Sequence, residues 1–200
     1  FGQIIVTKLQ CALEKLVAYF QKWKIKINEE KTQAVFFTRK RKACFYPTTQ
    51  LKINGTSIPW SDNIKYLGVH LDRKLIFELH IKKQIEKFHL ARNMLYPLIR
   101  RGSPLSHENK IILAKVVFQS IILYACPVWG VCAASHVKKL QICQNKLLKM
   151  MLNLPWHFST RILHNSNNIR LVRDRINAVT ERFKFSSGLS ENPLISNLYE

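Results

Sequence analysis

The first part of the chain changes from a helical to a strand-like pattern of apolar residues. Residues 4–23 carry apolar side chains at the i, i+3, i+4, i+7 spacing of one helical face. In residues 23–27 apolar side chains alternate with lysine, which predicts a strand, a turn at 28–30 and a return strand over 34–38. The apolar positions of the predicted helix are Ile5, Leu9, Ala12, Leu13, Leu16, Phe20 and Trp23.

Two further segments complete the predicted sheet. Asn54-Gly55 stands between apolar runs, and this residue pair favours the positive φ angles of a two-residue hairpin. Residues 64–71 predict one more strand, and the basic run 39–42 predicts a solvated loop. Residues 1–75 are therefore expected to form one helix with a small antiparallel sheet.

Beyond Lys74 the apolar period is helical. The spacing predicts a helix from about residue 81 to 98, and a second one, apolar nearly all round and therefore buried, that starts at an N-cap Ser106 and runs to about Tyr124. A third helix is expected between an N-cap Ser135 and Pro155, and a last one over 170–185. The core side of the third helix is expected to be Val137, Leu140, Cys143, Leu147, Met151 and Leu154.

These patterns predict an α+β fold. A small antiparallel sheet with one helix over residues 1–75 is followed by a mainly α-helical bundle over 76–185, and 186–200 is a polar, loosely ordered tail. Residues 116–134 form a stretch without charged side chains that is long enough to span a membrane. Gln119, Ser120 and Pro127 within this stretch favour a buried helix and a turn instead.

The charge balance points to a polyanionic partner. The chain has 32 Lys and Arg against 12 Asp and Glu, a net charge of +20, and nucleic acid is the commonest partner for such a surplus. The five cysteines lack a CxxC pair and are odd in number, which favours reduced thiols in an intracellular compartment.

The residues alone indicate no catalytic centre. The gaps between Cys126, Cys132, His136 and Cys143 do not match structural zinc spacing, so core cysteines are expected and no metal site. The three aspartates are scattered, which argues against a two-metal site within this chain. Glu29-Glu30 is expected to be a solvated turn, and the histidines His80, His89 and His107 are expected near helix starts or on helix surfaces.

Four strings in order resemble one family. They are WKIKINEEKT at 23–32, KYLGVHLD at 65–72, LYACPVWG at 123–130 and KLQICQNK at 139–146. Together they resemble the end of the palm and the thumb of reverse transcriptases of non-LTR (LINE-type) retrotransposons, most of all the jockey-like elements of insects. The resemblance extends from the first helix to about residue 185.

The resemblance implies roles for matching residues. Asn28, Lys31 and Thr32 match the family's Asn-x-x-Lys-Thr motif, whose lysine would face the triphosphate and stabilise the departing pyrophosphate. An alternative for Lys31 is a pairing with Glu29 or Glu30 in a solvated turn. Tyr66, Leu67 and Gly68 match the primer grip, where a glycine lets the backbone approach the primer on a neighbouring strand. The alternative there is a plain strand with Gly68 as a bulge.

The helical part then corresponds to a thumb that holds an RNA/DNA duplex by its phosphates. The lysines off the core stripes would make these contacts, although each could equally be part of a solvated surface: Lys82, Lys83, Lys87, Lys138, Lys139, Lys146 and Lys149. Implied partners are RNA, RNA/DNA duplex and the upstream palm and fingers of the same polyprotein, with no membrane. The implied location is nuclear and in cytoplasmic ribonucleoprotein.

One departure limits the expected activity. The family's metal-binding Asp-Asp, preceded by an aromatic and a small residue, is absent from this sequence. The chain, which starts at Phe1, is therefore expected to be a fragment that binds no cofactor and is inactive alone, with Mg²⁺ required by the complete polymerase. The alternative is a stand-alone basic nucleic-acid-binding module derived from such an element.

Overall fold

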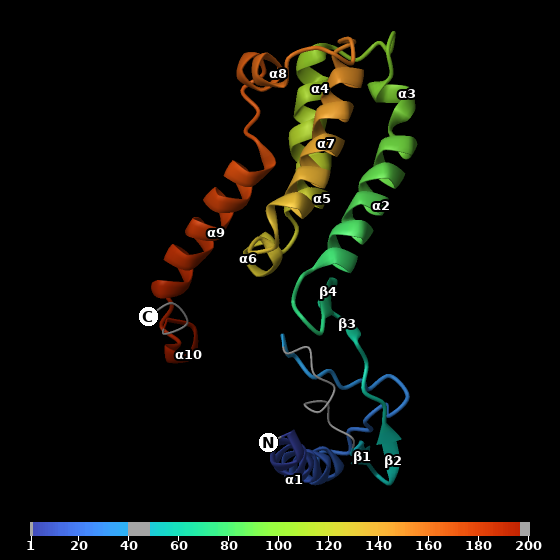
Figure 1. The fold of residues 1–200 in the computed structure, drawn as a ribbon, viewed down its shortest axis with the longest axis vertical. Coiled ribbons are helices and arrows are strands. Elements are labelled where there is room, and N and C mark those ends of the chain that lie inside the picture. The colour runs from blue at the N-terminus through green and yellow to red at the C-terminus, as the bar shows by residue number, and fades with distance from the viewer. Residues whose placement is uncertain (1, 40–48, 197–200) are drawn as a thin grey trace. The chain divides into compact units, whose positions relative to one another are not determined.

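A computed structural model describes residues 2–39 and 49–196 (Figure 1). The chain divides into two compact units, unit 1 up to Ile76 and unit 2 from Phe77. Unit 1 combines a helix with short strands, and unit 2 is helical. The α+β fold class is confirmed. The boundary between Ile76 and Phe77 is one residue after the expected boundary between residues 75 and 76. The assignment of the two units to palm and thumb stays a prediction.

Unit 1 holds one long helix and two separate two-stranded antiparallel sheets. The first sheet pairs Leu51 with Ile58 and turns at Asn54-Gly55, as predicted, with φ of 48° and 84° at these two residues. The second pairs Asn63 with Asp72. The elements are α1 (Gly2–Lys22), β1 (Leu51–Ile53), β2 (Thr56–Ile58), β3 (Asn63–Tyr66) and β4 (Val69–Asp72).

The core of unit 1 lies between α1 and the first hairpin. Val6 of α1 is buried with Leu51, Ile53 and Ile58, and burial of these side chains drives the contact. The predicted apolar face of α1 is only partly the buried one: Leu13 packs against this core as expected, together with Val6 and Val17, which were not among the predicted positions. Within the described chain the partly buried neighbours of this core are Leu13, Val17, Ile27, Ala34 and Trp60, whereas the side chains left exposed include Ile5, Leu9, Leu16 and Trp23.

The hairpin predicted for residues 23–38 was wrong. Lys24 has a φ of 55°, and the N–H of Ile25 donates to the carbonyl of Phe20 at 2.9 Å, so this segment ends the helix. Ala34 forms only an isolated parallel bridge with Trp60. The strand pairing expected within the segment is thus replaced by contacts to later parts of the unit. The basic run from residue 40 to 42 lies outside the described residues.

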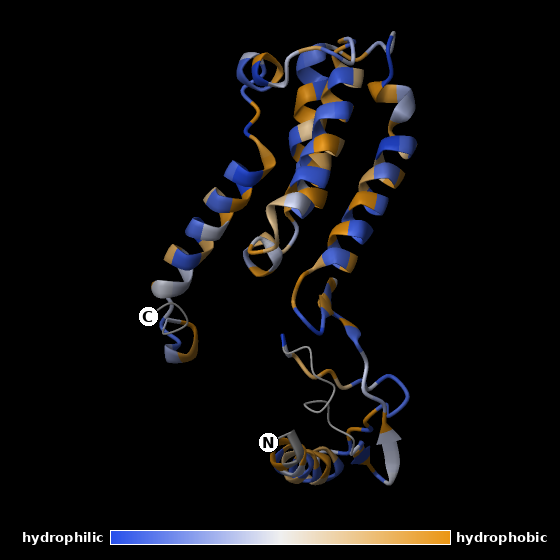
Figure 2. Ribbon diagram, viewed as in Figure 1, coloured by the Kyte–Doolittle hydropathy of each residue, from blue (hydrophilic) through white to orange (hydrophobic). Residues whose placement is uncertain are grey.

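Unit 2 consists of helices around one core. Figure 2 shows hydrophobic and hydrophilic residues mixed along α2, α7 and α9, as expected of helices with one buried side. The helices are α2 (Glu78–Met94), α3 (Tyr96–Ile99), α4 (His107–Leu113), the π-helical η2 (Ala114–Phe118), α5 (Gln119–Leu123), α6 (Cys126–Trp129), α7 (Ala134–Met151), α8 (Thr160–Ser166), α9 (Val172–Gly188) and α10 (Pro193–Ser196).

Aromatic rings and leucines fill this core. The rings of Phe88 on α2 and Phe118 on η2 lie 5.1 Å apart, and the indole N–H of buried Trp129 donates to the Tyr124 carbonyl at 2.7 Å. The N–H at Nη1 of Arg173 donates to the carbonyl of Gly130 at 3.0 Å and ties α9 to α6. Side chains that α7 buries include Val137, Leu140, Cys143, Leu147, Leu148 and Met151.

The structure confirms some predicted helix ends and corrects others. The hydroxyl of Ser106 accepts from the N–H of Asn109 at 3.3 Å and caps α4 as predicted. Ser135 does not cap α7, because the helix starts one residue before it at Ala134, and Met151 ends it ahead of Pro155. Leu154 therefore lies beyond the helix and is only partly buried.

The remaining boundaries also differ from the prediction. Met94 ends α2, and the chain continues into α3 through Leu95. The helix expected to be buried all round exposes Ile112 and Val116. The helix α8 and the last helix α10 were not predicted, and α9 continues through Gly188 into the expected polar tail.

In the described parts of the chain, none of the helices combines the length and the apolar character needed to cross a lipid bilayer. The charge-free stretch at 116–134 is interrupted by α6 and its turns.

Candidate nucleic-acid interface

The Asn-x-x-Lys-Thr segment is a closed turn that leaves its lysine exposed. The Asn28 side-chain oxygen accepts from the Lys31 backbone N–H at 3.0 Å, and the Thr32 hydroxyl donates to the Asn28 carbonyl at 2.7 Å. Asn and Thr side chains stabilise turns in this way. The two polar residues of the motif therefore fix the backbone, and the ammonium group of Lys31 is the part of the motif free to contact an anion.

Glu29 attaches this turn to the first hairpin. Its carboxylate accepts from the Asn54 side-chain amide and from the Thr56 hydroxyl, both at 2.8 Å. These hydrogen bonds to the charged form, with the nearby charge of Lys26, lower the pKa of Glu29. No ion pair joins Glu29 or Glu30 to Lys31 among the described residues. The roles of Asn28 and Lys31 toward substrate stay predictions.

The single strand predicted over 64–71 was wrong, because the chain reverses within it. Strands β3 and β4 pair across a turn at Leu67-Gly68, where φ is 46° and 81°. Tyr66 and Leu67 are 63% and 75% exposed at this tip. Gly68 is thus a turn residue rather than a bulge, and the three residues expected to grip a primer form the tip of a hairpin instead of a strand platform.

Leu67 occupies a backbone conformation that leucine disfavours. The two hairpins of unit 1 have the same pair of positive φ angles, but the first uses Asn54-Gly55, which suits that geometry. A branched side chain in the left-handed region costs on the order of 1 kcal/mol. The turn thus holds a leucine in a disfavoured conformation with its apolar side chain mostly in solvent.

The seven predicted lysines fall into two groups. Five are exposed: Lys82, Lys87, Lys138, Lys139 and Lys146. Lys83 forms an ion pair with Glu86 at 2.8 Å, which as a solvent-exposed i,i+3 pair contributes little to stability. The ammonium of Lys149 donates to the Trp156 carbonyl at 2.7 Å, so this lysine holds a loop. None of the seven is shown to contact phosphate.

Helices α2 and α7 bring positive charge together around His89. Burial lowers the pKa of His89, and the charges of Arg92 and Lys146 lower it further. Arg92, on α2, and Lys146, on α7, therefore both lie near His89. Sequence reasoning missed Arg92, although it stands on the same predicted helix as the three lysines of α2.

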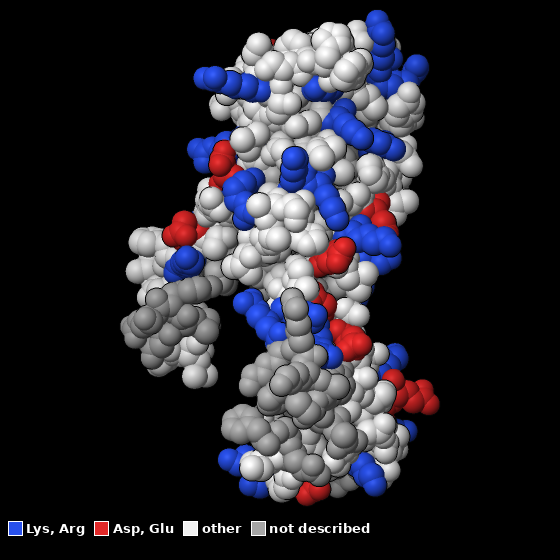
Figure 3. Space-filling view, in the orientation of Figure 1, with Lys and Arg blue, Asp and Glu red and all other residues white. Residues whose placement is uncertain are grey.

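The central part of unit 2 carries no carboxylate. The sequence has no Asp or Glu between Glu108 and Asp174, while nine Lys and Arg stand in this stretch. On the face of the helical unit shown in Figure 3, Lys and Arg outnumber the acidic side chains. Such a surface attracts polyanions over distances of about 10 Å at moderate salt.

The histidine and cysteine predictions meet different outcomes. His80 lies in the first turn of α2, near a helix start as expected, but it is buried there, and its ring lies 5.8 Å from that of Trp129. Cys126, Cys132 and Cys143 are buried free thiols, as expected, and burial raises the pKa of each. Among the described residues, no three His, Cys, Asp or Glu side chains gather in a way that could hold a metal.

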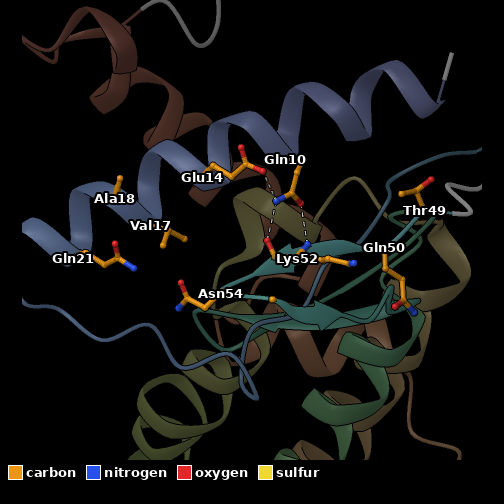
Figure 4. Close-up of a pocket in the computed structure, with 10 residues that line it drawn as sticks. Gln10, Glu14, Val17, Ala18, Gln21, Thr49, Gln50, Lys52 and Asn54 are labelled. Atoms are coloured by element: carbon orange, nitrogen blue, oxygen red, sulfur yellow. Dashed lines mark hydrogen bonds between the residues drawn. The ribbon is translucent and has the colours of Figure 1, made fainter.

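A groove of about 550 Å³ lies in unit 1 between α1 and the first hairpin (Figure 4). Gln10 and Glu14 of α1 line one wall and Lys52 and Asn54 the other. Its polar groups already bond to each other: the Gln10 amide N–H donates to Glu14 at 3.1 Å and to the Lys52 carbonyl at 3.0 Å. Gln10 is therefore engaged in holding α1 to the first hairpin.

Comparison with known proteins relates the chain to enzymes of mobile elements. It is 30% identical over 178 residues to the probable RNA-directed DNA polymerase from transposon X-element of Drosophila melanogaster, which is 89% of this chain and 19% of that protein. It is 29% identical over 189 residues to the RNA-directed DNA polymerase from mobile element jockey of Drosophila funebris, and 27% over 190 residues to that of Drosophila melanogaster, covering 20% of each. No family model matches the chain, and no solved structure matches it significantly.

The chain is thus related to the RNA-directed DNA polymerases of mobile elements. Within that class its relatives are the jockey, X-element and BS polymerases, and the resemblance drawn from the four motifs is confirmed. The chain spans about a fifth of the length of the curated relatives it matches, which is consistent with a C-terminal part of such a polymerase.

Proposed function

We propose that this chain is the palm end and thumb of a mobile-element reverse transcriptase and that it grips the RNA/DNA primer–template duplex. The observation that carries the proposal is the stretch of the helical unit from residue 109 to 173, which has nine Lys and Arg and no Asp or Glu. A thumb that moves along any sequence needs phosphate contacts, which supply affinity without base recognition. The relatives' activity as RNA-directed DNA polymerases supports this choice of nucleic acid.

Two features of unit 1 support a role beside the primer. The exposed Tyr66-Leu67 tip offers apolar side chains on a short hairpin, and Gly68 lets a backbone approach closely. Lys31 presents a cation on a turn that Asn28, Glu29 and Thr32 hold in place. A positioned cation of this kind could neutralise the charge that develops on a departing pyrophosphate.

The metal chemistry of such a polymerase would come from outside this chain. Two Mg²⁺ ions need clustered carboxylates, and the residues described here do not form such a cluster. In this proposal the upstream palm holds the metal ions and carries out the nucleotide transfer, and this chain positions the duplex.

The binding test is salt-dependent association of the 200-residue chain with an RNA/DNA hybrid, followed by fluorescence anisotropy. The logarithm of the affinity is expected to fall linearly with the logarithm of the salt concentration, with a slope of about 0.9 per phosphate contacted. Changing Lys138, Lys139 and Lys146 together to glutamine is expected to weaken binding and to reduce this slope.

A matched variant removes the same charge elsewhere. Lys8, Lys15 and Lys22 are exposed on α1, and changing them together to glutamine is expected to alter the slope much less. Equal losses in the two triple variants, or binding that ignores salt, would contradict the proposal. The alternative, a stand-alone binding module, is favoured if the transcript has a start codon next to Phe1. An open frame with an aromatic-Ala-Asp-Asp string shortly before Phe1 favours the polymerase.

A further inference from the structure

Trp156 is the most exposed large apolar side chain in the described part of unit 2. It is 86% exposed in the loop between α7 and α8, whereas Trp129 in the same unit is fully buried. Tryptophan has a large apolar surface and is usually well buried. An indole held almost entirely in solvent points to a ligand with a flat apolar face.

The loop that carries Trp156 is held by a series of hydrogen bonds. Asn153, two residues after the end of α7, has a φ of 58°, and the N–H of Leu154 donates to the Lys149 carbonyl at 2.8 Å. The Lys149 ammonium then reaches the Trp156 carbonyl at 2.7 Å, and the N–H of Phe158 donates to the Pro155 carbonyl at 3.1 Å. The loop thus presents its indole from a fixed backbone, which lowers the entropy lost when a ligand binds.

The surroundings of the loop select the kind of ligand. Trp156 lies within the stretch that has no carboxylate, and Lys146 and Arg161 are exposed on the two helices it joins. The His157 ring stands edge-on to the indole, with centroids 5.6 Å apart. An exposed aromatic ring in a loop whose two adjoining helices carry exposed cations suits a single-stranded nucleic acid, in which unpaired bases stack on the ring and phosphates meet the cations.

We propose that the Trp156 indole stacks on an unpaired base of a single-stranded segment next to the gripped duplex. The inference rests on the proposed function, because it adds a single-strand site to the duplex grip. Lys149 is a positioning residue in this arrangement: it holds the carbonyl of Trp156 and not the base itself. A base inside a duplex already stacks on its neighbours, so this site favours unpaired nucleotides.

The test compares a blunt RNA/DNA hybrid with the same hybrid carrying a single-stranded RNA extension of about six nucleotides. The 200-residue chain and its Trp156→Ala and Trp156→Phe variants are titrated with both. Loss of one stacked base is expected to weaken binding of the extended hybrid about tenfold in Trp156→Ala. Binding of the blunt hybrid should change less than about twofold, and phenylalanine should restore most of the loss.

A second readout follows the indole itself. The fluorescence of Trp156 is the part of the signal that Trp156→Phe lacks. Binding of the extended hybrid is expected to quench this part of the signal. Lys149→Met is expected to reduce the preference for the extended hybrid while leaving Trp156 in place, because the loop loses its tie. Quenching by the extended hybrid that is the same in Trp156→Phe would overturn the stacking contact.

The outcomes separate this inference from the proposed function. Hybrid binding with normal salt dependence, but with the same affinity for the extended hybrid in Trp156→Ala as in the parent chain, overturns the stacking site alone. Absence of all hybrid binding overturns both. A change in oligomeric state on Trp156→Ala, without a change in affinity for either hybrid, would show that the indole contacts protein and would also overturn the inference.

Discussion

The side chain of Gln10 pairs with the backbone of Lys52 in both directions. Its oxygen accepts from the Lys52 N–H at 2.9 Å, and its amide donates to the Lys52 carbonyl at 3.0 Å (Figure 4). A helix side chain thereby supplies the hydrogen bonds that a neighbouring strand would give to the edge of β1. This pair fixes the register between α1 and the first hairpin. Glu29 is attached to the same hairpin through Asn54 and Thr56.

Removing this pair is expected to loosen the first hairpin. Gln10→Ala deletes both hydrogen bonds and should destabilise unit 1 by about 1–2 kcal/mol, since each bond contributes about 1 kcal/mol. The Lys52 amide is expected to exchange its hydrogen faster in the variant, as measured by NMR. Gln21→Ala, on the same helix, is the control, and an unchanged Lys52 amide in Gln10→Ala would contradict the assignment.

Relieving the backbone strain at the second hairpin should separate stability from binding. Leu67→Asn places a residue that tolerates positive φ at the turn and should stabilise the hairpin by up to about 1 kcal/mol. The same change removes the exposed apolar side chain and is expected to weaken hybrid binding. Leu75→Asn is the matched control, because Leu75 also has a positive φ, of 54°, but lies outside the tip. A Leu67→Asn variant that binds as well as the parent would remove the tip from the interface.

Gly130 is required for the approach of α6 to α9. A Cβ at this position would lie 2.6 Å from both the Cys126 carbonyl oxygen and Cγ2 of Ile176. Gly130→Ala should therefore destabilise unit 2 by about 1–3 kcal/mol, as overpacking does in other cores. Urea unfolding measures the loss. Gly188→Ala is the control, because a Cβ there meets nothing within 4 Å, and equal effects of the two changes would refute the steric explanation.

The stability of unit 2 is expected to fall as the pH drops below about 6.5, the ordinary pKa of histidine. Burial and the charges of Arg92 and Lys146 lower the pKa of His89 in the folded chain. The unfolded chain therefore binds a proton at a higher pH than the folded chain, and stability rises with pH through the interval between the two pKa values. His89→Gln should remove this part of the pH dependence, measured as the urea midpoint from pH 5 to 8. An identical pH profile in the variant would exclude His89 as its source.

Local chemistry decided which turns could be predicted from sequence. Asn54-Gly55 is a hairpin in sequence and in structure because both residues favour positive φ. Leu67-Gly68 adopts the same geometry, but leucine gives no turn signal, and the hairpin was interpreted as one strand. Pairing with β4 supplies the energy that overrides this local preference.

Packing decided what the sequence could not reveal of the candidate site. The lysines of the predicted thumb were found by their helical spacing, but the tie between Lys149 and the loop carbonyl depends on how the chain turns after α7. Likewise, burial of His80 against Trp129 joins residues far apart in sequence. A tryptophan directly after the proline that follows the helix was the available signal for Trp156, and sequence reasoning did not use it.

The π-helical turn η2 bears on how this region aligns with its relatives. In η2 the N–H of Gln119 donates to the carbonyl of Ala114, five residues back. Such a turn absorbs one extra residue, which would otherwise rotate all later side chains by about 100° around the helix axis. Phe118 within the turn and Ile122 after it are thereby buried, as are Ala114 at its start and Lys110 before it. A relative one residue shorter here would form a regular helix with the same ends, so a single-residue gap in an alignment belongs inside 114–118 rather than in a flanking loop.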